Sequence, residues 1–357
     1  MRTQTRPRLL WILNHKTLMP DEVGIIRSLG WQVFTPKVLP RGFDSRSSSL
    51  ERSDDHLGIA PEALDVLKRH RFYERHWPPT VSSIINQYFD VVVTAFYQES
   101  FASAVHDFDG LIIARAFGRE GSSNYEQLIS HWDSQLLRAI SQLRDRFVFG
   151  QAYDNISSVE GATLRSRAIT LPLCAPSWVS PAAGKWHGSE PCVLFFCPMI
   201  ATIPYYREIF DRIKRDFADV PHIIFGKQQS VVEDPTVRGN LSDSDLRDLY
   251  AACRLFVYPS IEERHLHYGP IEAMVVGAPV LYFKGTMLDT QAGGPTAGAC
   301  TDIHEMRAKI FSLLSGDQAL AREIQQSQQR VLSRFDNGRA LRAWAAVLAK
   351  AGRTSRC

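Results

Sequence analysis

The sequence has few cysteines, no long hydrophobic run and little excess charge, and each absence excludes a class of protein. Its six cysteines form no CxxC pair, so a disulfide framework is not indicated and a reducing, cytoplasmic location is expected. No stretch approaches the roughly 18 apolar residues of a membrane-spanning helix. A net charge of +3 is too small to predict nucleic-acid binding, but it suits an anionic small ligand or a weak, peripheral contact with the inner face of a plasma membrane.

What the sequence does have is enough length for more than one hydrophobic core. A chain of 357 residues exceeds the size at which single cores stop growing, so two domains are expected. The stretch MRTQTRPRLLWILNH at 1–15 has a short apolar run and no cleavage site of small residues, so it is interpreted as a first strand and not as a signal peptide. Cys192 and Cys197 lie in another apolar run, where small buried side chains are expected.

Strand-like and helical patterns alternate through the first half of the chain. Short runs of branched and aromatic residues predict strands at 8–15, 31–37, 90–96, 109–117 and 146–154. Amphipathic spacing predicts helices at 19–30, 61–77, 124–145 and 160–168. The polar residues 38–60 are expected to form a long loop. This alternation indicates parallel βαβ units with helices on both faces of a sheet.

A segment rich in Pro, Gly, Ser and Ala at 176–190 interrupts the pattern and is interpreted as a linker. The alternation then restarts and ends in amphipathic helices. The expected domains are 1–175 and 191–335, with a carboxyl-terminal helix at 336–357 packing back on the first domain. The predicted fold class is α/β, with two tandem, doubly wound Rossmann-like domains that bind ligands at the carboxyl ends of their strands.

The most informative stretch is EERHLHYGPIEAMVVGAPV at 262–280, between a predicted strand and a predicted helix. A helix that starts at Gly269 and Pro270 presents N–H groups and the positive end of its dipole, which favour a phosphate group. Glu272 lies in the first turn. Its carboxylate either accepts hydrogen bonds from vicinal hydroxyls, such as those of a ribose, or only complements the helix dipole.

The loop before this helix is crowded with ionisable side chains. Glu262 and Glu263 stand at its mouth. Arg264, His265 and His267 follow, with positive charge that could face a diphosphate. A loop histidine taken alone is usually solvated, so the combination on one strand, loop and helix carries the prediction. The candidate donor-binding residues are Arg264, His265, His267, Tyr268, Gly269, Pro270 and Glu272, together with Lys227.

Residues 237–283 resemble the donor-binding segment of the GT-B glycosyltransferases, in particular the retaining, family 4-like group with an E-x7-E motif that includes many bacterial polysaccharide enzymes. The elements Y-P-S, E-A-M and G-x-P-V occur in the family's order. The resemblance implies a GT-B fold in which Glu272 binds the ribose of a nucleotide. Counting forward from Pro259 gives Glu263 as the other, catalytic glutamate. Counting back from Glu272 gives Arg264, because this loop has one extra residue.

Two departures from the family pattern concern the diphosphate. The family's Gly-Phe-Gly is replaced by Arg-His-Leu-His-Tyr. The family's Arg and Lys after the domain's first strand have no match in FFCPMIATIPYYRE at 195–208, which has no lysine and whose first arginine, Arg207, comes late. Lys227, after the next strand, is either a substitute or a solvated loop lysine. The basic loop at 264–267 is a second means of holding the diphosphate.

The resemblance places the acceptor in the first domain. The candidates there are Arg115, Arg119 and Asp154, with His15 or Asp154 as a base for an inverting reaction, although a retaining enzyme of this family needs none. The segment LKRHRFYERHW at 67–77 is either a solvated helix face or a membrane-surface contact.

The sequence thus predicts a glycosyltransferase that moves a sugar from a UDP-, GDP-, dTDP- or CMP-sugar to a glycan or lipid-linked glycan in capsule or lipopolysaccharide assembly, with retention. No metal or other cofactor is implied. Asp243 and Asp245 are interpreted as helix-capping residues after Ser242, and not as metal ligands. The alternatives are a sugar-nucleotide epimerase of similar layout and a non-catalytic GT-B-like subunit that binds nucleotide, glycan or another transferase.

Overall fold

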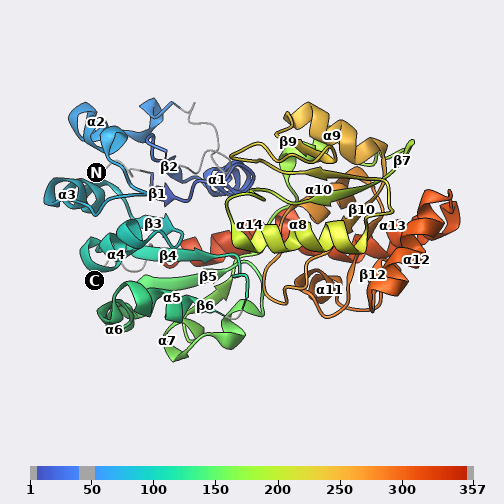
Figure 1. Ribbon diagram of the computed structural model, residues 1–357. Helices are drawn as coiled ribbons and strands as arrows, with labels where there is room; N and C mark the ends of the chain where they lie inside the picture. Colours follow the sequence, from blue (N-terminus) through green and yellow to red (C-terminus); the bar gives the residue numbers. More distant parts are fainter. Residues whose placement is uncertain (1–5, 40–52, 122, 352–357) are drawn as a thin grey trace. The chain divides into compact units, whose positions relative to one another are not determined.

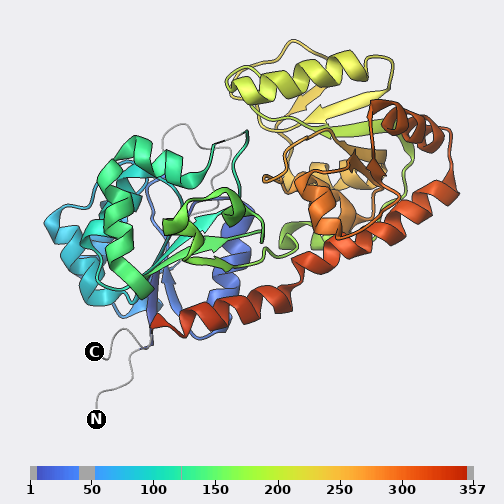
Figure 2. The same cartoon turned by 90° about the horizontal axis from the view of Figure 1, so that it is seen from below.

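A computed structural model of the chain describes residues 6–39, 53–121 and 123–351 (Figure 1). The chain divides into two compact units. Unit 1 comprises Met1–Cys174 and Asn337–Cys357, and unit 2 comprises Ala175–Asp336. Each unit contains a parallel sheet of six strands with helices packed around it (Figure 2), so the predicted α/β class is confirmed. In the described part of the chain, no helix combines the length and the apolar character needed to cross a membrane.

The sheet of unit 1 has the strand order β2-β1-β3-β4-β5-β6. Its strands are β1 (Arg8–Ile12), β2 (Gln32–Phe34), β3 (Val91–Thr94), β4 (Leu111–Ala116), β5 (Phe147–Gln151) and β6 (Ala168–Thr170). Its helices are α1 (Leu18–Ser28), α2 (Pro61–Arg69), α3 (Pro79–Tyr88), α4 (Gln98–Asp107), α5 (Tyr125–Trp132), α6 (Ser134–Leu143), α7 (Ala162–Arg165) and α14 (Asn337–Leu348). Strands β3 and β4 are buried along their whole length, as expected for a sheet covered on both faces. Helix α14 packs on α1, and Trp344 lies 6.0 Å from Trp11 between ring centroids.

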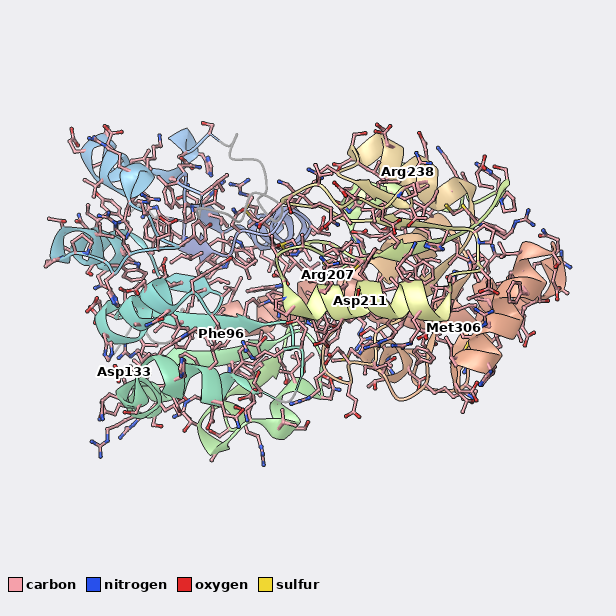
Figure 3. All side chains as sticks on the ribbon, in the orientation of Figure 1. Phe96, Asp133, Arg207, Asp211, Arg238 and Met306 are labelled. Carbon is pink, nitrogen blue, oxygen red and sulfur yellow. The ribbon has the colours of Figure 1, made fainter. Side chains whose placement is uncertain are left out.

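Two helices of unit 1 differ from the sequence prediction. The helix predicted at 124–145 is interrupted at Asp133 (Figure 3), whose side chain accepts a backbone hydrogen bond and so begins a second helix. The helix predicted at 61–77 ends at Arg69, where the backbone becomes extended. Helices α3 and α4 were not predicted. Of the predicted polar loop, residues 40–52 lie outside the described residues.

The sheet of unit 2 has the order β12-β11-β10-β7-β8-β9. Its strands are β7 (Glu190–Phe196), β8 (His222–Phe225), β9 (Val237–Gly239), β10 (Cys253–Tyr258), β11 (Val280–Phe283) and β12 (Ala299–Cys300). Its helices are α8 (Pro204–Asp216), α9 (Asp243–Ala252), α10 (Gly269–Val276), α11 (Met287–Ala292), α12 (Ile303–Leu314) and α13 (Gln318–Leu332). Side chains such as Phe195 and Val257 form a buried cluster with α8 and α12. Helices α9 and α10 pack on each other and on β10, and α9 begins at the predicted cap, Ser242.

The segment predicted as a linker, 176–190, belongs to unit 2. It includes the 3-10 helix η5 (Ser177–Ala182), which packs on α9 and α10. Beyond η5, the N–H groups of Gly184 and Trp186 donate to the last carbonyls of α10 over 3.1 and 3.0 Å. These hydrogen bonds and the packing of η5 therefore hold the segment against α10.

Two thiols on neighbouring strands allow a test of the strand register. Cys192 in β7 and Cys253 in β10 bring their Sγ atoms within 3.4 Å. Cys253 is opposite Glu190 and Leu255 is opposite Val193, so Cys192 and Cys253 are diagonal neighbours. Strands about 4.8 Å apart with an offset of about one residue keep the Cα separation within the range that a disulfide spans. We expect diamide to oxidise this pair, with a mass loss of two hydrogens, while the buried Cys197 and Cys300 stay reduced. The variant Cys192→Ser should not cross-link, and a cross-link to any other cysteine would contradict the register of β7 and β10.

Candidate functional site

The loop between β10 and α10 lies at the edge of the sheet where α/β folds bind ligands. Strand β10 ends at Tyr258, and α10 begins at Gly269. The carboxyl ends of all six parallel strands meet at this edge. Gly269 and Pro270 are buried at the helix start, and the N-cap residue Tyr268 makes no side-chain capping hydrogen bond. A helix start without a side-chain cap is a suitable place for an anion.

Glu272 is held by two neutral donors from different elements. It lies in the first turn of α10 and is 7% exposed. Trp178 Nε1 of η5 donates to Oε1 over 3.0 Å, and the Tyr250 hydroxyl of α9 donates to Oε2 over 2.8 Å. Burial, and then the charge of Glu272, raise the pKa of Tyr250 well above its usual value, so this hydroxyl keeps its proton. A carboxylate can accept about four hydrogen bonds.

His267 lies between two tyrosine hydroxyls. The Tyr206 hydroxyl of α8 is 3.0 Å from Nε2, and the Tyr258 hydroxyl of β10 is 3.1 Å from Nδ1. The backbone N–H of His267 also donates to the Tyr258 hydroxyl over 3.1 Å. Burial raises the pKa of Tyr258, so it remains neutral. The loop before α10 is therefore fixed to β10 and α8, in contrast to the glycine-rich loop of the family pattern.

The other predicted loop residues differ in exposure. Glu263 is exposed, whereas Arg264 and His265 are half-buried. The ring of His265 lies 4.6 Å from that of His267, in an edge-on arrangement. One loop and one helix start therefore carry Glu263, which was predicted as catalytic, and most of the predicted donor-binding residues, namely Arg264, His265, His267, Tyr268, Gly269, Pro270 and Glu272.

The ends of β7 and β8 are joined by Gln228. Its side chain accepts from the N–H of Ile200 and donates to the carbonyls of Cys197 and Gly226, each over 2.9 Å. Lys227 precedes it and is half-buried, and within the described ranges its ammonium pairs with no carboxylate. Because β8 and β10 are parallel members of one sheet, Lys227 lies at the same edge as the loop before α10.

Gly226 is required by the close approach of these two loops. Its φ is +131°, and an added Cβ would lie 2.8 Å from Pro198 N. We expect Gly226→Ala to lower the free energy of unfolding by about 1–3 kcal/mol through backbone strain. Gly24→Ala, inside α1 with nothing within 4 Å of the new Cβ, should instead raise it by about 0.5–1 kcal/mol. Urea denaturation checks both, and equal stability of the two variants would contradict the loop geometry.

Trp178, Tyr250 and Arg212 are among the residues of this edge that were not predicted from the sequence. Trp178 and Tyr250 hold Glu272, and Arg212 of α8 donates to the carbonyl of Pro259 over 3.2 Å, at the end of β10. The one local signal was the presence of tryptophan, Trp178 and Trp186, in a linker of mostly small residues. Nothing local marks Tyr250 or Arg212, because their partners are distant in sequence.

In unit 1, His15 caps the start of α1. Its Nδ1 accepts from the N–H groups of Thr17 and Leu18, each over 3.3 Å. A neutral imidazole has one acceptor and one donor nitrogen, so with Nδ1 accepting, the proton is on Nε2. These contacts engage Nδ1 only, and the role of His15 as a base stays a prediction.

Arg115 has no exposed surface. Its guanidinium is paired with the buried Glu22 of α1, and Nη1 donates to the carbonyl of Gly150 over 2.9 Å. It also lies 5.6 Å from the ring centroid of Trp344 in α14. These contacts place Arg115 inside unit 1 between β4, α1 and α14, whereas the sequence analysis expected it at a strand end facing a ligand.

The remaining acceptor candidates make local contacts. Arg119 is half-buried and donates to the Ser123 hydroxyl over 3.1 Å. Asp154 is exposed and accepts from the Thr170 hydroxyl.

Several basic side chains of the segment 67–77 contact carboxylates of unit 1. Its described ion pairs are Lys68 with Asp54, Arg69 with Asp65 and Arg71 with Glu74, and the His76 ring contacts the Glu99 carboxylate. This pairing favours the solvated-face interpretation, because carboxylates of unit 1 offset part of the positive charge that would attract an anionic membrane surface.

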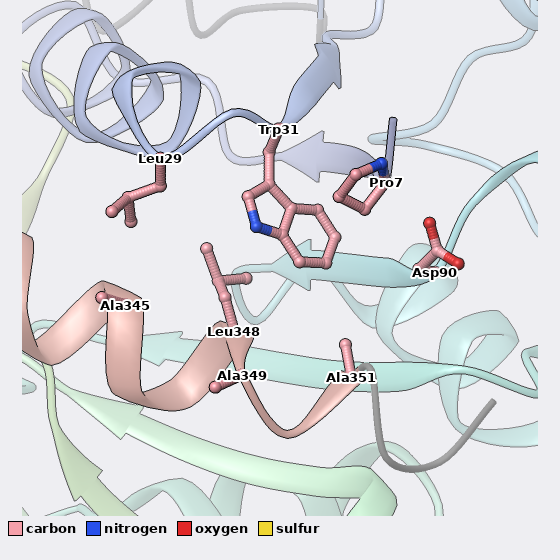
Figure 4. Close-up of a pocket in the computed structure, with 8 residues that line it drawn as sticks. All are labelled: Pro7, Leu29, Trp31, Asp90, Ala345, Leu348, Ala349 and Ala351. Atoms are coloured by element: carbon pink, nitrogen blue, oxygen red, sulfur yellow. The ribbon is translucent and has the colours of Figure 1, made fainter. Parts of the chain in front are cut away.

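A cavity of about 340 Å³ lies in unit 1 (Figure 4). Its lining residues are Pro7, Leu29, Trp31, Asp90, Ala345, Leu348, Ala349 and Ala351. Pro7 and Asp90 directly precede β1 and β3, so the cavity is at the amino edge of the sheet. Its position and its mostly apolar lining make it unsuitable for a nucleotide, which α/β folds bind at the opposite edge.

No family model matches the chain, and no curated protein matches its sequence. Its structure is similar to solved ones. Sucrose-phosphate synthase from Thermosynechococcus elongatus is 16% identical with a TM-score of 0.56, and the match covers 98% of each chain. HepE from Anabaena, solved in complex with UDP and glucose, is 13% identical with a TM-score of 0.60, and the match covers 96% of this chain and 99% of HepE. A glycosyltransferase from Rickettsia africae is 12% identical with a TM-score of 0.57, over 98% of this chain and 99% of that one. The chain therefore has the two-domain α/β fold of the GT-B glycosyltransferases.

Proposed function

We propose that this protein is a glycosyltransferase that moves a sugar from a nucleotide-sugar to a glycan or lipid-linked glycan in surface polysaccharide assembly. The observation that carries the proposal is the first turn of α10. There, Glu272 is buried, hydrogen-bonded and next to a helix start without a side-chain cap. A carboxylate for ribose hydroxyls and an anion site for a diphosphate therefore lie within one turn of helix.

In this proposal each part of the site has a separate task. Glu272 accepts from the ribose hydroxyls, and the N–H groups at the start of α10 hold the diphosphate. Lys227, Arg264 and His267 add positive charge or donors at the same edge, in place of the missing Arg and Lys. Glu263 contacts the donor sugar. The family resemblance suggests retention and no metal.

A retaining transfer needs no protein base. The bond from the anomeric carbon to the phosphate oxygen breaks, the acceptor oxygen bonds to that carbon on the same face, and the leaving phosphate takes the acceptor proton.

A thermal-shift screen against UDP-, GDP-, dTDP- and CMP-sugars tests the proposal, followed by mass spectrometry of a glycan mixture. UDP-glucose is the first donor to try, since HepE was solved with UDP and glucose. A ligand at 100 times its Kd stabilises a protein by about 2.7 kcal/mol, which raises Tm by several degrees. EDTA should leave the shift unchanged. The absence of any shift would contradict the proposal, and turnover without an acceptor would identify an epimerase instead.

A further inference from the structure

The segment 175–190 reaches the proposed donor site through one side chain, Trp178. The chain enters unit 2 at Ala175, whose N–H donates to the carbonyl of Phe335 over 2.7 Å, next to the residue where it leaves unit 2. Three residues later, the indole of Trp178 donates to Glu272. The carbonyl of Trp178 accepts from Arg247 Nη1 of α9 over 3.0 Å. Trp178 is thus fixed through its main chain to α9 and through its side chain to α10.

Trp178 and Tyr250 hold both oxygens of the Glu272 carboxylate. Trp178 Nε1 approaches one oxygen and the Tyr250 hydroxyl approaches the other. Neither donor carries a charge, so neither neutralises the carboxylate, and both come from elements other than α10. Two vicinal hydroxyls form paired hydrogen bonds with a carboxylate only when its oxygens face them, because paired hydrogen bonds are directional. A glutamate side chain without these donors would lose entropy on adopting that orientation.

We propose that Trp178 is a positioning residue that, with Tyr250, orients Glu272 toward the ribose hydroxyls of the donor nucleotide. This inference rests on the proposed function. Recognition of the ribose should therefore depend on Trp178, whereas recognition of the base and the diphosphate should not. The donor is accordingly a ribonucleotide sugar, and a nucleotide without ribose hydroxyls gains nothing from Trp178.

Isothermal titration with paired ligands tests this inference. The ligands are the nucleoside diphosphate that binds best and its 2′,3′-dideoxy counterpart. Hydrogen bonds to a charged group predict that the wild type prefers the ribonucleotide by about 10- to 100-fold. In Trp178→Phe, which keeps an aromatic ring but loses the N–H donor, this preference should fall about tenfold. The affinity for the dideoxy ligand should change by less than about twofold.

Trp186→Phe is the matched control. Trp186 lies in the same segment, is also half-buried, and donates through Nε1 to the carbonyl of Cys253 over 2.9 Å. The variant Trp186→Phe should keep the wild-type preference for the ribonucleotide. Tyr250→Phe should lose that preference as Trp178→Phe does, because it removes the second donor to Glu272.

The possible outcomes separate the inference from the function on which it rests. A wild type that binds neither ligand would overturn the proposed function. A wild type that prefers the ribonucleotide, with Trp178→Phe keeping that preference or losing affinity for both ligands equally, would overturn only the role of Trp178. Circular dichroism of each variant confirms that the compared proteins are folded.

Discussion

Glu272→Gln is expected to lower the affinity for the donor nucleotide by at least about tenfold, since a hydrogen bond to a charged group contributes about 1.5–3 kcal/mol. The amide oxygen can still accept from Trp178, and the amide nitrogen can donate to the Tyr250 oxygen once that hydroxyl turns. The fold should therefore survive, with a loss of about 1 kcal/mol. Titration calorimetry measures the affinity, and transferase activity should fall with it at subsaturating donor.

Glu323→Gln provides the control for this substitution. The chemical change from glutamate to glutamine is the same, but Glu323 is an exposed residue of α13 in the same unit. The affinity of Glu323→Gln for the donor nucleotide should equal that of the wild type. Equal affinity of Glu272→Gln and the wild type would remove Glu272 from the donor site and leave it as a carboxylate that joins η5, α9 and α10.

Arg115→Met is expected to lower the free energy of unfolding by about 3–5 kcal/mol, because it leaves Glu22 buried without its cation. The substituted side chain preserves much of the volume between β4, α1 and α14. Adding Glu22→Leu should restore much of the loss, since a buried ion pair can be replaced by apolar groups of similar size. Urea denaturation measures the free energy of unfolding of the wild type, of Arg115→Met and of the double variant. Arg119→Met, on a half-buried neighbour, should change stability by less than about 1 kcal/mol.

The loss of unfolding free energy in Arg115→Met should depend on pH. Burial raises the pKa of Glu22 above its ordinary 4.5 in the folded protein, and Arg115 opposes this rise. Without Arg115, the pKa of folded Glu22 rises further, while that of the unfolded chain stays the same. Stability is therefore lost as pH rises from the unfolded pKa through the raised folded pKa. The deficit relative to the wild type should be larger at pH 8 than at pH 5, and a deficit independent of pH would contradict the account.

Much of the architecture could be predicted because its signals are local. The run VVVT of β3 and the run LIIARA of β4 are buried on both sides, and such runs identify the interior strands of parallel sheets. The break between α5 and α6 was missed because it depends on Asp133 acting as a cap within an otherwise continuous amphipathic pattern. The short helix α11 and the two-residue strand β12 have too few residues to show a period.

The candidate site could be predicted only as far as it is continuous in sequence. The loop and helix start at 262–272 were found because their residues follow one another. The contacts of Glu272 with Trp178 and Tyr250 span 94 and 22 positions and arise from the packing of η5, α9 and α10. Arg115 was misplaced for the same reason, since its position at a strand end does not reveal that Glu22 lies beside it.

A crystal structure of the protein with the nucleoside diphosphate selected by the thermal screen tests the central claim most directly. The account predicts both ribose hydroxyls within hydrogen-bonding distance of the Glu272 carboxylate, with the diphosphate at the start of α10 near Gly269. The indole of Trp178 should still donate to Glu272. A nucleotide bound elsewhere, with its ribose away from Glu272, would contradict the account.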